Sequence, residues 1–466
     1  MARADLVIRN VEVGGVPGRA VWIADGRIVQ AGASLSGSAE EIDARGGALI
    51  PGLIDHHIHL LATAAQADSL VLDDAPTGEA FASRLRAYAA ARPSGTWLRV
   101  TGYHERVAGL LDRHQLDALV LHHPLRIQHQ TGGLWLLNSR ALAFVDQGET
   151  PEGLERDASG AATGRIWRAD TWLAERIGKT PPPLAPLGAA LAAAGVTGVM
   201  DASVTTSAET ARILAAARRA GDLPQRLGLM SGGALAAPDD GAFVVGPLKI
   251  LPDDHDLPPL DDVVQHIRQA RAWDRPVAVH CVTAGELALT LAAFDTAGSA
   301  PGDRIEHGGM IPAEAIPVLV QLGLTVVTQP GFVFERGDRY LADVDPREHA
   351  DLYRCASLLA AGVPVASSSD APYASPDPWR AMRAAVRRRT KQDQAIGAAE
   401  RIDAATALDL YLGDFANPGG PPRLAAPGQA ADLCLLKAPI REALDALDAD
   451  LVAATIVGGR VVYRTA

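Results

Sequence analysis

Eight short apolar runs alternate with helical stretches, and this alternation constrains the fold more than any other feature of the chain. The runs lie at residues 48–59, 195–202, 225–231, 243–251, 275–281, 303–309, 323–330 and 362–370. Strands that alternate with helices form parallel sheets, and eight such units are the number in a closed (β/α)8 barrel. A doubly wound open sheet is the alternative, but no G-x-G-x-x-G follows the first strand. We therefore predict an α/β fold with a TIM-type barrel.

The two ends of the chain resemble each other and flank the barrel. Asp25-Gly26 and Gly458-Gly459 each stand between two apolar runs, which predicts a hairpin at each end. The economical interpretation is one small β-sandwich domain built from residues 1–50 and 425–466. The barrel then occupies residues 51–424.

One long segment interrupts the regular alternation of predicted strands and helices. About 135 residues separate the first run from the second, far more than one crossover helix requires. Active sites of these barrels form at the carboxyl ends of the strands, where this insertion begins. We predict that residues 61–183 form a lid or substrate-binding subdomain.

The charge balance excludes some classes of partner. With 43 Lys and Arg against 55 Asp and Glu, the net charge is −12, which argues against nucleic acid and against an anionic membrane surface. The three scattered cysteines argue for a reducing compartment. The N-terminus lacks the apolar core of a signal peptide, and no apolar stretch reaches the ~20 residues of a membrane span. We expect a cytoplasmic protein with a small-molecule partner; the sequence leaves open whether it forms a homo-oligomer.

Metal-competent side chains gather at the ends of the predicted strands. His57 and His59 are separated by one residue, so in a strand they share a face, and Asp55 shares it with them. His280, His307 and Asp370 close three later runs: "RPVAVH", "DRIEH" and "VPVASSSD". A barrel would bring all of these ends together, and neutral imidazoles with carboxylates bind divalent cations. Asp370 could instead cap a helix that begins near "APYASPDP".

Lys249 lies near the end of the fourth run, in "GPLKIL". An unpaired ammonium is expensive to bury there. Lys249 could carry a carbamate that bridges two metals, reach solvent along its stem, or pair with an acid.

Several motifs together resemble the metal-dependent amidohydrolase superfamily. The matching pieces are "PGLIDHHIH", "RIEHGG", "GVPVASSSDAP" and "PGQAADLCLL", with His280 between the first two. In the insertion, "GYHE", "TGGLWLLNSRAL" and "GAATGRIW" are similar to the amidohydrolase family 3 branch, which includes N-substituted formamide deformylase. The resemblance covers nearly the whole chain.

The resemblance implies a composite domain and a barrel that holds one or two divalent metals, usually zinc. By matching positions, the implied metal ligands are His57, His59, Lys249 as a carbamate, His280, His307 and Asp370. Asp370 would also shuttle protons. His104 in "GYHE" and His255 in "LPDDHDLPP" are candidates for contact with the substrate.

The predicted activity is hydrolysis of an amide-like C–N bond, other than a peptide bond, in an N-acyl, N-formyl or cyclic amide. A bound cation lowers the pKa of its water to ~7, so that hydroxide forms at neutral pH. Asp370 would take the proton and deliver it to the leaving nitrogen. A lactone or ester hydrolase on the same metals, and a metal-binding barrel without catalysis, are the alternatives.

Overall fold

The computed structural model describes residues 4–29, 40–67, 69–72, 77–130, 133–177, 181–252 and 256–465. The chain separates into two compact units. One contains residues 1–60 and 184–466, and the other contains residues 61–183.

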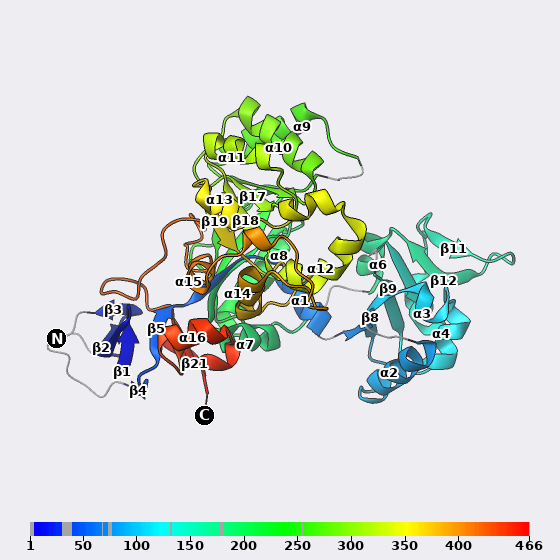
Figure 1. The fold of residues 1–466 in the computed structure, drawn as a ribbon. Coiled ribbons are helices and arrows are strands. Elements are labelled where there is room, and N and C mark those ends of the chain that lie inside the picture. The colour runs from blue at the N-terminus through cyan, green and yellow to red at the C-terminus, as the bar shows by residue number, and fades with distance from the viewer. Residues whose placement is uncertain are drawn as a thin grey trace. The chain divides into compact units, whose positions relative to one another are not determined.

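Eight parallel strands form a nearly closed barrel in the first unit (Figure 1). In sheet order they are β19 (Val365–Ser367), β18 (Thr325–Thr328), β17 (Arg304–His307), β16 (Val277–Cys281), β15 (Val244–Ile250), β14 (Arg226–Ser231), β13 (Val196–Asp201) and β6 (Leu53–Ile58). Each barrel strand after β6 therefore pairs with the barrel strand that precedes it in the chain. The predicted TIM-type barrel is confirmed.

Helices connect most of the barrel strands. Between successive strands from β13 to β19 lie α8 (Ala208–Ala220), α9 (Leu260–Ala272), α10 (Ala284–Ala297), α11 (Ile316–Leu322), α12 (Gly331–Asp343) and α13 (Ala356–Ala360). α7 (Ala185–Ala193) precedes β13, while α14 (Pro378–Arg387), α15 (Ala404–Asp409) and α16 (Ile440–Ala446) follow β19. Residues 232–243, between β14 and β15, contain no helix. None of the helices in the described part of the chain is long and apolar enough to cross a bilayer.

The barrel core is packed rather than hollow. Ile54, Met200, Met230 and Ala278 come from four different strands and form one buried cluster, together with Ala202 and Phe415. Apolar side chains that fill the space between strands are typical of this architecture. The carboxyl ends of the strands, above this cluster, remain available for polar residues.

The seam between β6 and β19 is closed by a segment that follows α15. The Ile54 amide donates to the Tyr411 carbonyl at 3.0 Å, and the Ser367 amide donates to the Leu410 carbonyl at 2.9 Å. Residues 410–411 thus bridge the lower part of the seam, where β6 and β19 do not pair directly.

At its upper end the seam closes through the residues of the predicted site. The Asp370 amide donates to the His57 carbonyl at 2.8 Å. Beside it, the Asp55 carboxylate accepts from the Ser369 amide at 3.0 Å and from the Ser369 hydroxyl at 2.5 Å. These bonds fix the first barrel strand against the loop that follows the last one.

Strands from both chain ends form a second sheet. In order they are β22 (Arg460–Arg464), β21 (Val452–Val457), β20 (Leu433–Leu436), β5 (Ala48–Pro51), β1 (Leu6–Val13), β2 (Val16–Ala24) and β3 (Arg27–Val29), and β4 (Glu40–Asp43) also pairs with β1. Both predicted hairpins are present, β2–β3 and β21–β22. The small β domain from both termini is confirmed, although its strands form one hydrogen-bonded mixed sheet where the sequence predicted a sandwich.

The first predicted run, residues 48–59, is two strands that belong to different sheets. β5 pairs with β20 in the terminal sheet, whereas β6 pairs with β13 in the barrel. Gly52 stands at the break, and a Cβ there would lie 2.0 Å from Cγ2 of Thr197. The close approach of Thr197 therefore requires glycine where the chain passes from one sheet to the other.

The second unit contains a six-stranded sheet. Its order is β11 (Leu154–Arg156), β12 (Ala162–Trp167), β10 (Leu134–Leu137), β9 (Leu125–His129), β8 (Leu98–Tyr103) and β7 (Leu70–Val71). Its helices are α2 (Gly78–Ala90), α3 (Glu105–Ala108), α4 (Arg113–Leu119), α5 (Ser139–Val145) and α6 (Asp170–Ile177), while α1 (Leu60–Ala67) begins at the boundary. The unit has its own apolar clusters, one of which contains Phe81, Leu85, Val100 and Ile127.

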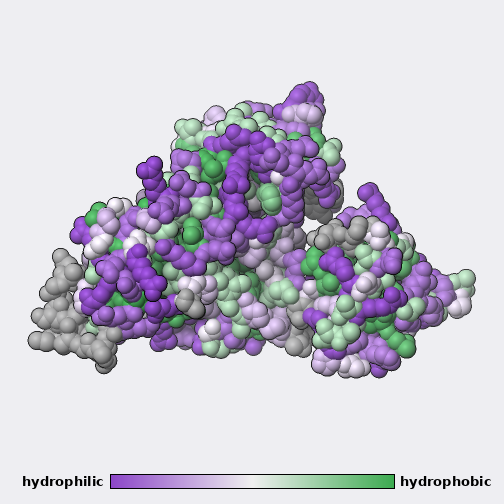
Figure 2. All heavy atoms as spheres, turned by 60° about the horizontal axis from the view of Figure 1, so that its bottom comes forward, coloured by the Kyte–Doolittle hydropathy of each residue, from purple (hydrophilic) through white to green (hydrophobic). Residues whose placement is uncertain are grey.

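Hydrophilic side chains cover most of the face drawn in Figure 2, and hydrophobic ones appear there as small separate spots. Scattered apolar side chains of this kind are ordinary on a protein surface.

Replacing Gly52 by alanine tests the close contact between the two sheets. We expect Gly52→Ala to lower the free energy of unfolding by about 1–3 kcal/mol, because the new methyl overlaps Thr197 in a packed region. Urea unfolding measures the change. Gly233→Ala is the control, since a Cβ at Gly233 meets nothing within 4 Å. Equal stability of the two variants would contradict this account of the break at Gly52.

Candidate metal centre

The six predicted ligands come from the ends of five barrel strands and line one cavity. His57 lies in β6 and His59 directly follows it, Lys249 lies in β15, His280 in β16 and His307 at the end of β17, while Asp370 follows β19. The cavity has a volume of about 600 Å³. The sequence prediction that these side chains meet above the barrel therefore agrees with the geometry.

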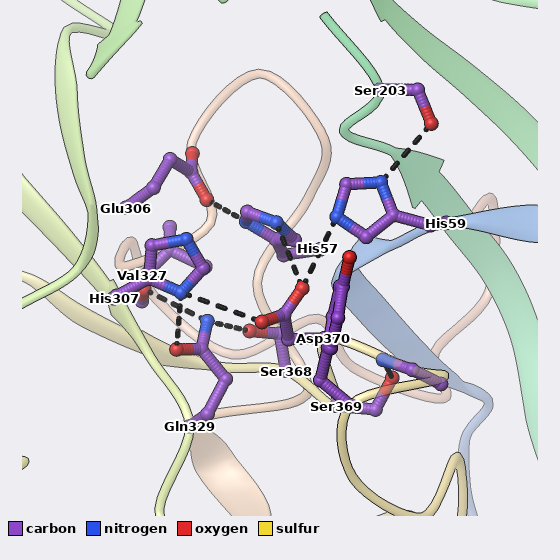
Figure 3. A network of polar contacts seen from close by, with 12 residues as sticks. His57, His59, Ser203, Glu306, His307, Val327, Gln329, Ser368, Ser369 and Asp370 are labelled. Atoms are coloured by element: carbon purple, nitrogen blue, oxygen red, sulfur yellow. Dashed lines mark hydrogen bonds and ion pairs between the residues drawn. The ribbon is translucent and has the colours of Figure 1, made fainter. Parts of the chain in front are cut away.

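Asp370 is the centre of the tightest group. Its Oδ1 lies 3.3 Å from Nε2 of His57 and 3.2 Å from Nε2 of His59, and Figure 3 shows the three side chains directed toward one another. Ligands at ~2.1 Å around one tetrahedral zinc stand ~3.4 Å apart. Nε2 of His57 and Oδ1 of Asp370 are buried without a hydrogen-bond partner. The spacing and the unpartnered atoms both fit a shared divalent cation.

Asp370 is charged, which suits this arrangement. Burial alone would raise its pKa, but the neighbouring His307, His57 and His59 hold the pKa well below its usual value. The alternative role as a helix cap falls to another residue, because Asp377 accepts the Trp379 amide at the start of α14.

Three further predicted ligands adjoin this group. The ring of His307 lies 4.7 Å from that of His57 and 4.4 Å from that of His280, measured between centroids. Burial, and then the positive charges of Lys249 and His57, lower the pKa of His280 to about 3. At neutral pH the His280 imidazole is therefore neutral, with a lone pair that a cation can use.

Lys249 is buried in the same cavity, and its Nζ has no hydrogen-bond partner. Burial lowers the pKa of this amine, and the nearby carboxylates of Glu306 and Asp370 only partly offset the effect. The sequence allowed three roles for Lys249. One of them, a side chain that extends to place its ammonium in solvent, does not agree with the burial of Nζ. A lowered pKa makes the neutral form of the amine, which can add to carbon dioxide, easier to reach.

Sequence reasoning missed a pair of buried charges that supports His57. Nδ1 of His57 contacts Oε2 of Glu306, and Oε1 of Glu306 accepts from Nε of Arg304 at 2.5 Å. Arg304 and Glu306 are both almost fully buried. Burial would raise the pKa of Glu306, but Arg304, His57 and Lys249 hold the pKa below its usual value. The signal was present in "DRIEH", where two charged residues alternate within a barrel strand.

This contact fixes which nitrogen of His57 faces the cavity. A carboxylate only accepts hydrogen bonds, so the proton of the imidazole stays on Nδ1 toward Glu306. Burial and the charge of Lys249 oppose protonation of His57, but Glu306 and Asp370 raise its pKa. A bound metal would displace the second proton, and the lone pair is then on Nε2, beside Asp370. Carboxylates that hold a ligating histidine in this way also raise its basicity.

Two other histidines are oriented by neutral partners. Nδ1 of His59 lies 3.0 Å from the hydroxyl of Ser203, which follows β13. Nδ1 of His307 lies 2.9 Å from Oε1 of Gln329, whose amide nitrogen donates to Ser368. That second bond makes Oε1 of Gln329 an acceptor, so His307 carries its proton on Nδ1 and its lone pair on Nε2.

Glu306 and His307 are consecutive, yet both face the site. Successive side chains of a regular strand point to opposite faces. His307 has φ of 71°, in the left-handed region, and this turn redirects its side chain. Backbone conformations of this kind are costly and concentrate at functional sites.

The remaining candidates have other positions. Asp55, which shares the His57 face in the sequence pattern, bonds to Ser369 and His57 amides and closes the seam instead. His104 belongs to the second unit, where its Nδ1 accepts the Arg106 amide at the start of α3. Its role toward substrate stays a prediction. His255 lies outside the described residues.

Comparison with known proteins agrees with this geometry. A model of the amidohydrolase family matches residues 40–463. N-substituted formamide deformylase from Arthrobacter pascens is 26% identical over 89% of this chain and 90% of its own length. Putative amidohydrolase YtcJ from Bacillus subtilis is 24% identical over 81% of this chain and 80% of its own length.

The fold also matches solved structures. An uncharacterized metal-dependent hydrolase from Pyrococcus furiosus superposes with a TM-score of 0.72 at 19% sequence identity, covering 93% of this chain and 98% of that one. At this identity the similarity supports the architecture alone. The family model, which spans both the terminal sheet and the barrel, shows that this chain belongs to amidohydrolase family 3.

Proposed function

We propose that this protein is a metal-dependent hydrolase that cleaves an amide-like C–N bond in a small molecule. The observation that carries the proposal is the position of Asp370, whose carboxylate lies within 3.3 Å of both His57 and His59 at the mouth of the barrel. A carboxylate held there can bind a cation and exchange a proton with a water on the same cation.

The donor set fits one or two divalent ions, and zinc is the expected metal because nitrogen and carboxylate ligands suit it. His57, His59 and Asp370 would hold the first ion. His280 and His307 would hold a second. Lys249 stands in the same cavity with an unpartnered Nζ. Addition of its neutral amine to carbon dioxide, with loss of one proton, would give a carbamate that bridges the two ions.

A divalent metal, when bound, polarises the substrate carbonyl and lowers the pKa of water. Asp370 would accept the proton of the attacking water and then donate it to the leaving nitrogen. His57, held by Glu306, and His307, held by Gln329, keep their donor nitrogens in place throughout.

The similarity to a curated N-substituted formamide deformylase supports an amide substrate. Esters and lactones undergo the same attack, so an ester hydrolase remains the alternative. A cytoplasmic location and a small-molecule partner stay predictions. The three cysteines are buried and free, as expected of a protein in a reducing compartment.

A panel of N-formyl amines, N-acyl amines, cyclic imides and lactones tests the reaction class. We expect turnover of at least one amide-like substrate, loss of that turnover on chelation, and recovery with added zinc. Elemental analysis of protein purified without chelators should give about two metals per chain if Lys249 bridges a pair, and about one for a mononuclear site. Turnover of lactones alone would contradict the proposal.

Replacing Asp370 by asparagine tests its role in proton transfer. Asparagine keeps a ligand oxygen but cannot carry the proton, so we expect Asp370→Asn to retain most of the metal and to lower kcat by at least ~10²-fold. Steady-state kinetics and metal analysis measure the two effects. The control is Asp343→Asn, since Asp343 lines the same cavity but pairs with Arg339. Undiminished kcat in Asp370→Asn would exclude a proton-transfer role.

Replacing Glu306 by glutamine tests the support of His57. We expect Glu306→Gln to weaken metal binding by about 10- to 100-fold, because glutamine can still accept from Nδ1 but no longer supplies the negative charge that raises the basicity of His57. Competition with a chelator measures the affinity, and exposed Glu314→Gln is the control.

Glu306→Gln also leaves Arg304 buried without its carboxylate, which can destabilise the fold. The double variant Arg304→Met with Glu306→Gln removes that stranded charge. If the folded double variant binds metal as tightly as the wild type, the charge of Glu306 does not support metal binding by His57.

A further inference from the structure

One wall of the cavity is not used by the proposed chemistry. It is formed mainly by α12, together with two tyrosines from later loops, and its aromatic and basic members are Phe332, Arg336, Arg339, Tyr340, Tyr353 and Tyr373. α12 follows β18, which contributes none of the six predicted metal ligands. The wall therefore belongs to the space that a substrate would fill beyond the reacting bond.

Arg336 is held within this wall before any ligand arrives. Its guanidinium carbon lies 4.4 Å from the centre of the Phe332 ring, and Nη2 donates to the Tyr373 carbonyl at 3.2 Å. Stacking on an aromatic face and one hydrogen bond fix the plane of the group. The bond to Tyr373 uses one of the five N–H donors of the guanidinium.

Tyr373 connects Arg336 to the predicted metal centre. The Tyr373 ring lies 5.9 Å from the ring of His59, measured between centroids, and 5.8 Å from the Arg336 guanidinium carbon. The Tyr373 amide also donates to the Asp370 carbonyl at 2.9 Å. Arg336 thus lies one aromatic ring away from the residues that would carry out the reaction.

The charge of Arg336 is not balanced locally. No carboxylate of the described residues lies within 4.0 Å of its guanidinium. The two acids in the cavity wall are engaged elsewhere, since Asp343 accepts from Arg339 at 3.0 Å and Asp370 contacts His57 and His59. A partly buried cation without a counter-charge, facing a cavity, is suited to bind an anionic group of a ligand.

We propose that the substrate is an amide that carries a carboxylate, as in an N-acyl amino acid, and that Arg336 binds this carboxylate. The inference rests on the proposed amide hydrolysis and names its substrate class. The scissile carbonyl would lie at the histidines and Asp370, the carboxylate at Arg336, and an apolar or aromatic side chain against Phe332, Tyr340 and Tyr353. Planar, two-point recognition of carboxylates is what the guanidinium geometry favours.

A matched pair of substrates tests the proposal on the metal-loaded enzyme. N-formylphenylalanine, as both enantiomers, and N-formylphenethylamine differ only in the carboxylate. We expect kcat/KM to be about 10- to 100-fold higher for one enantiomer of the acid than for the neutral amide, mainly through KM. Arg336→Gln should remove this preference and leave the neutral amide nearly unaffected, because a carboxylate loses its charged partner.

Arg339→Gln is the control variant. Arg339 lies on the same helix and lines the same cavity, but it is already paired with Asp343. We expect Arg339→Gln to retain the preference for the acid. If both variants lose the preference for the acid equally, the positive charges of the wall attract the acid together. That result would overturn a specific role of Arg336.

A binding measurement separates this inference from the proposed reaction. Two hydroxamates, alike except for a distal carboxylate, bind metal without being hydrolysed, so their affinities do not depend on turnover. Tighter binding of the acidic hydroxamate by the wild type, lost in Arg336→Gln, supports the inference even if no amide is cleaved. Equal affinities in the wild type overturn it, and amide turnover can still stand. If the wild type cleaves the acidic and neutral amides equally well, the inference about Arg336 is wrong, but the proposed amide hydrolysis still stands.

Discussion

The hydrogen bonds across the barrel seam are the constraint on which the candidate site depends. Asp55 and Ser369 are 314 positions apart in sequence, yet the Asp55 carboxylate accepts two bonds from Ser369. Two residues after Asp55 and one after Ser369, the Asp370 amide donates to the His57 carbonyl. The first strand and the loop after the last strand are therefore held in register, and this register sets the spacing between Asp370 and the two histidines. Burial, the largest influence, raises the pKa of Asp55 to about 6, and its hydrogen bonds oppose that rise.

Buried charge is the second feature that shapes the site. Arg304, Glu306 and His57 form a chain of contacts that ends at the cavity, and Lys249 adds a further amine. Isolated charges at such depth would be strongly unfavourable, whereas a connected set is tolerated when each member has a partner. Three nitrogens of this set have no hydrogen-bond partner: Nη1 of Arg304, Nζ of Lys249 and Nε2 of His57. The last two belong to residues that line the cavity. The proposed cation and carbamate would give these two atoms partners.

Much of this arrangement could be predicted from the sequence, because parallel strands bring their carboxyl ends together wherever they lie in the chain. His57, His280 and Asp370 could be assigned to one end of the barrel on that basis alone. The need for glycine at the break between β5 and β6 could not be predicted, because the residue that approaches Gly52, Thr197, is distant in sequence. No sequence pattern identifies residues 410–411 as the segment that bridges the barrel seam. The inward turn of His307 depends on a φ of 71°, which strand alternation does not anticipate.

The residues proposed for the reaction and those proposed for substrate choice are on separate segments that meet at Tyr373. Asp370 and Tyr373 share one turn, whereas Arg336 and Phe332 belong to α12. Because α12 follows a strand without predicted ligands, substitutions along its cavity face can change the wall while the seam, and with it the spacing of His57, His59 and Asp370, is preserved. Barrel enzymes vary their substrates in this way, through the segments after each strand on an unchanged sheet. A change at Tyr373 is different, because it touches His59, Asp370 and Arg336 at once and would alter binding and reaction together.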